Sequence, residues 1–257
     1  MTLHFWQYAV VCPLVFLAGF VDAIAGGGGL ISLPAYMLIG LPAHNAVATN
    51  KFSACVGTAV ATGRYARNGY IPLRLALVCI PAALVGSSCG AELALRVPDG
   101  VFKILMLFIL PVVAIYSLRK KDLSGGSPLK ELPWRKTAWQ GILISLFMGV
   151  YDGFYGPGMG VFLMLLLTGV SHLDLNTAAG TTKIINLSTN FAALTVFLFN
   201  GKVIYPLGLT AMLFGMAGNW LGAKEFSKKG TRIVRPVILL VLAMFFVKIL
   251  WELFSEA

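Results

Sequence analysis

Long apolar segments constrain this chain most strongly. A helix needs about 20 apolar residues to span a bilayer. Eight stretches approach or exceed that length, at 6–25, 45–66, 72–95, 101–118, 138–155, 176–199, 203–223 and 233–253. Hydrophobic residues make up 58% of the chain and charged residues 12%, whereas soluble domains carry about 25% charged residues. The sequence therefore predicts an all-α integral membrane protein that crosses the bilayer several times.

The net charge of +10 is best explained by membrane topology. Most basic residues fall in three short regions: Arg64 to Arg74, 119–136 and 224–235. Lys and Arg are enriched in cytoplasmic loops of membrane proteins, so we place these regions in the cytoplasm. No nucleic-acid partner is expected.

The chain contains a tandem duplication. GFVDAIAGGGG at 19–29 aligns with GVYDGFYGPGM at 149–159, an offset of 130 residues. Further on, the offset is 132 and pairs TNK at 49–51 with TTK at 181–183. We therefore divide the chain into a first membrane repeat at 1–118, a basic cytoplasmic linker at 119–136, and a second membrane repeat at 137–257.

Each repeat also carries one short apolar piece after a glycine-rich break. The pieces lie at 30–41 and 160–170, after GGGG and GPGMG, and are too short to span the membrane upright. Each repeat then has about five segments: four long transmembrane helices and one short broken or re-entrant helix. Five is an odd number, so the sequence predicts two inverted-topology repeats with both termini outside the cytoplasm.

Inverted repeats with interrupted helices are a recurrent transporter architecture, with the binding site at the repeat interface near the midplane. Irregular backbone is tolerated at that depth only where protein buries it or it lines a water-filled cavity. A helix that restarts after a break directs free N–H groups and a positive dipole end at an anion. The predicted substrate-binding glycines are Gly26, Gly27, Gly28, Gly29, Gly156 and Gly158. The alternative is that these glycines only allow close helix packing.

Four charged residues lie inside predicted spans, at equivalent positions of the two repeats: Asp22 with Asp152, and Lys51 with Lys183. Charges near the bilayer centre are costly and mark function by default. Each lysine is expected to bind substrate oxyanions or, in an empty site, Asp22 or Asp152; the alternative is that the lysines reach the interface. The two carboxylates are candidate proton-coupling groups.

Polar residues continue from both lysines at helical spacing. In the second repeat they are Asn186, Thr189 and Asn190, and in the first Cys55, Thr58 and Thr62. Such residues either line a cavity or join helices by hydrogen bonds. The pairs Gly86/Gly90 and Gly218/Gly222 have GxxxG spacing and predict close helix packing.

These motifs resemble a known family. GFVDAIAGGGGLISLPA, LPAHNAVATNKFSA and GVYDGFYGPGMG are similar to the TauE/SafE sulfite and sulfonate exporter family, and within it to the YfcA-like subgroup of membrane transporters. The resemblance implies a multi-pass protein of the bacterial inner membrane that moves small sulfur-containing or organic anions, such as sulfite or sulfonates.

The family's motifs map onto particular residues of this chain. Its glycine motifs match Gly26–Gly29 and Gly156–Gly160, and its lysine motif matches Asn50 and Lys51. The second copy has Thr182 before Lys183, and Asn50 and Thr182 are predicted to bind substrate beside their lysines. Pro157 removes an N–H donor from the second glycine motif. The resemblance therefore leaves open whether the two repeats contribute equally to the site.

The sequence thus predicts a secondary transporter of small anions, with protons as the candidate coupling ion and the lipid bilayer as its surroundings. A passive anion channel is the nearest alternative, because the same cavity would serve it. A membrane-embedded enzyme is less favoured: the histidines His4, His44 and His172 lie near segment ends, with Asp174 close to the last. GGGG is not followed by the GK[ST] of a nucleotide-binding loop, so it is not read as a nucleotide site. No cofactor or metal is expected. The oligomeric state is left open.

Overall fold

The computed structural model describes residues 4–98, 101 and 132–229, and in these ranges the chain is helical with no strand. The helices are α1 Phe5–Ala25, α2 Gly29–Leu38, α3 Ala43–Arg67, α4 Leu73–Arg96, α6 Trp134–Phe154, α7 Met159–Gly169, α8 Leu175–Phe199 and α9 Tyr205–Lys229. Each coincides with a predicted segment. The largest difference is at the end of α9, which continues past 223 because no glycine or proline interrupts the chain before Gly230. The predicted segment at 233–253, nearly all of 101–118 and most of the linker lie outside the described residues.

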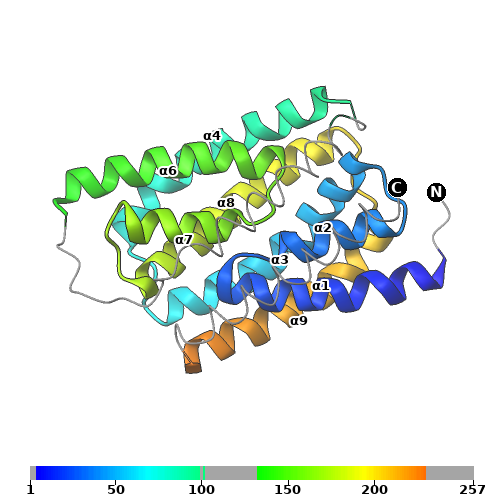
Figure 1. Cartoon of the computed structure of the whole chain (residues 1–257), viewed down its shortest axis with the longest axis horizontal. Helices are drawn as coiled ribbons and strands as arrows, with labels where there is room; N and C mark the ends of the chain where they lie inside the picture. Colours follow the sequence, from blue (N-terminus) through cyan, green and yellow to red (C-terminus); the bar gives the residue numbers. More distant parts are fainter. Residues whose placement is uncertain (1–3, 99–100, 102–131, 230–257) are drawn as a thin grey trace, which may run out of the picture.

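Helices from the two predicted repeats pack reciprocally. α4 and α6 lie side by side along one edge, α1 and α9 lie along the opposite edge, and α3 and α8 run between them (Figure 1). By the sequence alignment α1 corresponds to α6, and α9 corresponds to α4. The first helix of each predicted repeat thus packs against the third long helix of the other, as expected of two equivalent halves. The inversion of one half relative to the other stays a prediction.

Both edge contacts depend on glycine. A Cβ atom at Gly218 or Gly222 of α9 would overlap a main-chain carbonyl oxygen of α1, and one at Gly86 or Gly90 of α4 would overlap a carbonyl oxygen of α6. The two GxxxG pairs therefore allow backbone-to-backbone packing, as the sequence predicted.

The outer surface of the helices suits a lipid environment. Large apolar side chains point outward from several helices, among them Leu77 at 69%, Phe147 at 68%, Phe191 at 59% and Leu213 at 61% exposure. Helices α1, α4 and α8 are long and apolar enough to cross a membrane, whereas α2 and α7 are apolar but short. The architecture is that of an all-α integral membrane protein.

Both glycine-rich breaks interrupt the helices within a few residues. α1 ends where Gly26 adopts a left-handed conformation (φ 73°) and donates its N–H to the Asp22 carbonyl. In the second break Gly156 and Gly158 have φ of 97° and 78°. L-residues with a side chain are strained at such angles. The breaks thus require glycine at these positions.

Gly218→Ala tests the edge packing. The added methyl group must push α9 away from the Phe16 carbonyl, and overpacking of this kind costs about 1–3 kcal/mol. We expect a lower Tm for the purified protein in detergent. Gly63→Ala is the matched control, because a Cβ there meets nothing within 4 Å; it should leave the Tm unchanged or raise it. Equal Tm values for the two variants would contradict this packing.

Candidate functional site

The two glycine-rich breaks meet backbone to backbone. Added Cβ atoms at Gly26 and Gly160 would each overlap the other residue's Cα, so the two backbones are in direct contact. A Cβ at Gly29 would lie 3.0 Å from the Cα of Pro157. The Tyr151 hydroxyl donates to the Pro157 carbonyl oxygen at 2.6 Å and ties the second break to the end of α6. Glycine therefore has a packing role here as well as a conformational one.

Two ion pairs flank this crossing, and each joins one predicted repeat to the other; only the Asp22 side chain, at 15% exposure, is not fully buried. Lys51 Nζ on α3 lies 2.6 Å from Asp152 Oδ2 on α6, and both side chains are at most 4% exposed. Lys183 Nζ on α8 lies 3.0 Å from Asp22 Oδ2 on α1. The sequence left open which carboxylate each lysine would meet. In the structure each of these two lysines pairs with the aspartate of the opposite predicted repeat.

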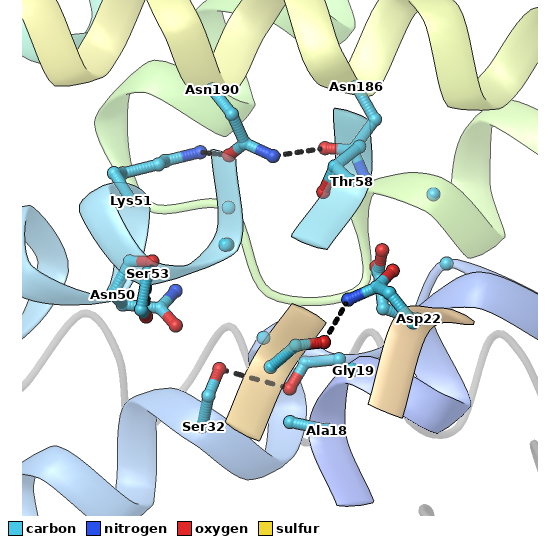
Figure 2. A pocket seen from close by; sticks show the side chains of 18 of the residues that line it. Ala18, Gly19, Asp22, Ser32, Asn50, Lys51, Ser53, Thr58, Asn186 and Asn190 are labelled. Carbon is cyan, nitrogen blue, oxygen red and sulfur yellow. Dashed lines mark hydrogen bonds between the residues drawn. The ribbon is translucent and has the colours of Figure 1, made fainter. Parts of the chain in front are cut away.

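The surroundings of Lys51 form a short polar chain. Its ammonium donates to Asn190 Oδ1 at 3.0 Å, and Asn190 Nδ2 donates to Asn186 Oδ1 at 3.1 Å. Figure 2 shows these three side chains directed toward one another. The partners of Lys51 are thus an amide and a carboxylate on different helices.

Lys183 is held differently. Its ammonium donates to the main-chain carbonyl oxygen of Asp22 as well as to the carboxylate. The Lys183 carbonyl in turn accepts from the Thr62 hydroxyl at 3.2 Å. Carbonyls at a helix C-terminus attract cations, so Lys183 fastens the end of α1 to α8.

A cavity opens beside the first pair. It offers about 50 Å³ to the centres of water molecules, several times the roughly 10–15 Å³ that one water needs. The predicted residues that line it are Asp22, Gly26, Gly28, Gly29, Asn50, Lys51, Asp152, Gly156, Asn186 and Asn190. Segments from both repeats therefore enclose it.

Four predicted binding residues do not line this cavity: Gly27, Gly158, Thr182 and Lys183. Thr58 lines it, whereas Cys55, Thr62 and Thr189 do not. Three polar lining residues were missed by sequence reasoning: Ser32, Ser53 and Asn219. Ser32 is a single small polar residue in the apolar helix α2, and Ser53 lies two residues after Lys51 on α3. Asn219 lies inside a GxxxG pair assigned only to packing.

The start of α2 is less available to an anion than the sequence suggested. The amides of Leu30, Ile31 and Ser32 already donate to the carbonyls of Gly27 and Gly28, at 2.9–3.1 Å. The Ser32 hydroxyl also donates to the Gly28 carbonyl. Because these groups are satisfied locally, the positive group that faces the cavity is the ammonium of Lys51.

Asp174 has a structural role. Its carboxylate caps α8 by accepting from the amides of Asn176 and Thr177, both at 3.1 Å. Such an N-cap stabilises a helix by about 1 kcal/mol. The cap explains Asp174 without a metal partnership with His172.

A multi-pass helical bundle with buried ion pairs beside a polar central cavity is typical of membrane transporters. Comparison with known proteins supports this class. The sequence model of the sulfite exporter TauE/SafE family matches residues 11–249. The chain belongs to this family, and it is therefore a membrane transporter and not an enzyme.

Three bacterial relatives are similar over nearly their full length. A probable membrane transporter protein of Haemophilus influenzae is 31% identical over 95% of this chain and 94% of its own. A second, ORF9 of a Sinorhizobium species, is 33% identical over 93% and 90%. A third, YfcA of Escherichia coli K12, is 32% identical over 93% and 88%. These likenesses are consistent with the bacterial inner membrane. No solved structure matches the chain significantly.

A double-variant cycle tests the crossed pairing. Lys51→Met leaves the Asp152 carboxylate buried without its partner, which costs about 3–5 kcal/mol, so we expect a large drop in the Tm of the detergent-solubilised protein. Adding Asp152→Asn should restore most of the loss. The matched control adds Asp22→Asn to Lys51→Met instead, and it should restore nothing. Rescue by Asp22→Asn, or by neither, would contradict the pairing.

Proposed function

We propose that this chain is a secondary transporter of small anions, with its substrate site in the cavity beside Lys51. One observation carries the proposal: Lys51 is buried to 2% exposure and lines a cavity. Among the described residues its ammonium is held by two side chains, Asp152 and Asn190, which can move away. The ammonium is a compact cation with three donors. It can exchange Asp152 and Asn190 for the oxygens of an arriving anion.

The substrate class follows from the size and chemistry of the cavity. Amide and hydroxyl groups of Asn50, Ser53, Asn186 and Asn190 line it together with one ammonium and the two carboxylates of Asp22 and Asp152. The neutral donors and the ammonium suit a small oxyanion once Lys51 has left its carboxylate partner. The family is described as sulfite exporters. Sulfite and small sulfonates are therefore the substrates that we propose.

Asp152 is the proposed proton-coupling residue. Its carboxylate competes with the anion for Lys51, because both are negative and the ammonium lies 2.6 Å from it. Protonation removes that competition and frees the lysine. A bound anion in turn favours the protonated carboxyl, so proton and anion bind together and move in one direction.

The two repeats have unequal parts in this proposal. Lys183 lies outside the cavity lining, whereas its ion-pair partner Asp22 is part of the lining. Lys183 then serves to hold the end of α1, and Asp22 is a secondary proton acceptor. The repeats at 1–118 and 137–257, oppositely oriented in the membrane, would alternate access to the cavity.

Flux in liposomes tests the proposal. Uptake of ³⁵S-sulfite by the purified wild-type protein should rise when an inward proton gradient is imposed. Lys51→Ala should abolish uptake. Lys51→Arg should retain little uptake, because the planar guanidinium group of arginine does not replace a compact ammonium. Asp152→Asn should keep anion exchange and lose the response to the gradient, since the amide leaves Lys51 free at every pH.

Lys136→Ala is the matched control, because Lys136 is exposed at the start of α6; its flux should equal that of the wild type. Correct folding of each variant is checked by size-exclusion chromatography. Full gradient-driven accumulation by Asp152→Asn would remove Asp152 from the coupling step. Normal uptake by Lys51→Ala would refute the anion site.

A further inference from the structure

Asn219 on α9 carries a buried acceptor that the transport scheme does not use. The residue is 3% exposed and lines the cavity. Its Nδ2 donates to the Gly215 carbonyl oxygen at 3.0 Å. Because a carbonyl oxygen can only accept, the amide end that contacts it must be the NH2 group, and this fixes the orientation of the amide. Its Oδ1 is buried and has no hydrogen-bond partner among the described residues.

Glycines fix this side chain in place. A Cβ at Gly19 of α1 would lie 2.8 Å from Asn219 Nδ2, and a Cβ at Gly57 of α3 would lie 2.6 Å from it. The two glycines leave just enough room for the amide beside α1 and α3. Because the Nδ2 end is enclosed and bonded, the amide cannot turn to satisfy Oδ1 elsewhere.

The equivalent position in the other repeat is satisfied. At the offset of 132 residues Asn219 corresponds to Ser87, and Gly57 corresponds to Thr189. The Ser87 hydroxyl donates to the Thr189 carbonyl oxygen at 2.7 Å, and Ser87 does not line the cavity. The open acceptor is thus a property of one side of the molecule, the side that holds Lys51.

A buried acceptor without a donor is costly, and native proteins rarely keep one without a reason. A ligand that brings its own donor into the cavity would remove that cost. The same cavity presents the cationic group of Lys51, which binds the negative end of a ligand. Together the two groups define a ligand with both an anionic oxygen and an O–H or N–H.

We propose that Asn219 determines specificity by accepting a hydrogen bond from the transported anion. The preferred substrate is a small anion that bears a donor, such as a hydroxyl or amino group, with its oxyanion on Lys51 and its donor on Asn219 Oδ1. This inference rests on the proposed anion site and narrows the substrate class within it.

A pair of sulfonates of equal size tests the inference. 2-Hydroxyethanesulfonate carries a hydroxyl where propane-1-sulfonate carries a methyl group. In liposomes with wild-type protein, we expect uptake of the hydroxylated anion to be favoured about tenfold or more, the effect of one well-placed hydrogen bond. Asn219→Leu, which keeps the shape of the amide, should bring the ratio close to one.

Asn219→Ser is the second variant and places at this position the residue type found at Ser87 in the other repeat. Its uptake ratio decides the outcome if Asn219→Leu does not fold. Ser87→Ala is the matched control and should leave the ratio unchanged. Equal uptake of both sulfonates by the wild type, or an unchanged ratio in the Asn219 variants, would mean that Oδ1 holds water only and would overturn the inference while the anion site stands. Failure of the wild type to carry either sulfonate or sulfite would refute the proposed function itself and this inference with it.

Discussion

Two buried lysines impose the central constraint on this fold. A charged group in a membrane interior is tolerated when it is paired or faces a polar cavity, and here each lysine finds the aspartate of the opposite repeat. Lys51 must reach α6 and Lys183 must reach α1. The two ion pairs therefore hold α3 against α6 and α8 against α1. The chain satisfies this demand only because glycine allows the two breaks to touch backbone to backbone, at Gly26 and Gly160.

The duplicated halves use this common scaffold differently. Lys183 is bound by both the carboxylate and the main-chain carbonyl of Asp22, which suits a fixed joint. Lys51 is bound by Asp152 and Asn190 at the wall of a cavity, which suits exchange of partners. The amide chain from Asn190 to Asn186 has no counterpart in the first repeat, where Thr58 and Ala54 occupy the equivalent positions. Of the two paired lysines, Lys51 lines the cavity and Lys183 does not.

Helix order and much of the cavity lining could be predicted from sequence, because apolar length, duplicated charges and glycine runs are strong local signals. The crossed pairing of Lys51 with Asp152 could not, since either aspartate is compatible with the spacing along the chain. Asn219 was missed for a related reason. It lies between two glycines that pack helices together, where a polar side chain is usually interpreted as a hydrogen bond between helices. Only the packing of α9 against α1 and α3 brings it to the cavity. The hydrogen bonds that the main-chain amides at the start of α2 make to Gly27 and Gly28 could not be predicted either, because they depend on how tightly the chain turns at the break.

Anomalous scattering from crystals soaked in selenite, a heavier analogue of sulfite, would test the central claim most directly. The account predicts one selenium peak in the cavity within bonding distance of Lys51 Nζ, with the distance between Lys51 and Asp152 increased and the pair of Lys183 with Asp22 unchanged. A peak at Lys183, or selenite bound with both ion pairs as they stand here, would contradict it.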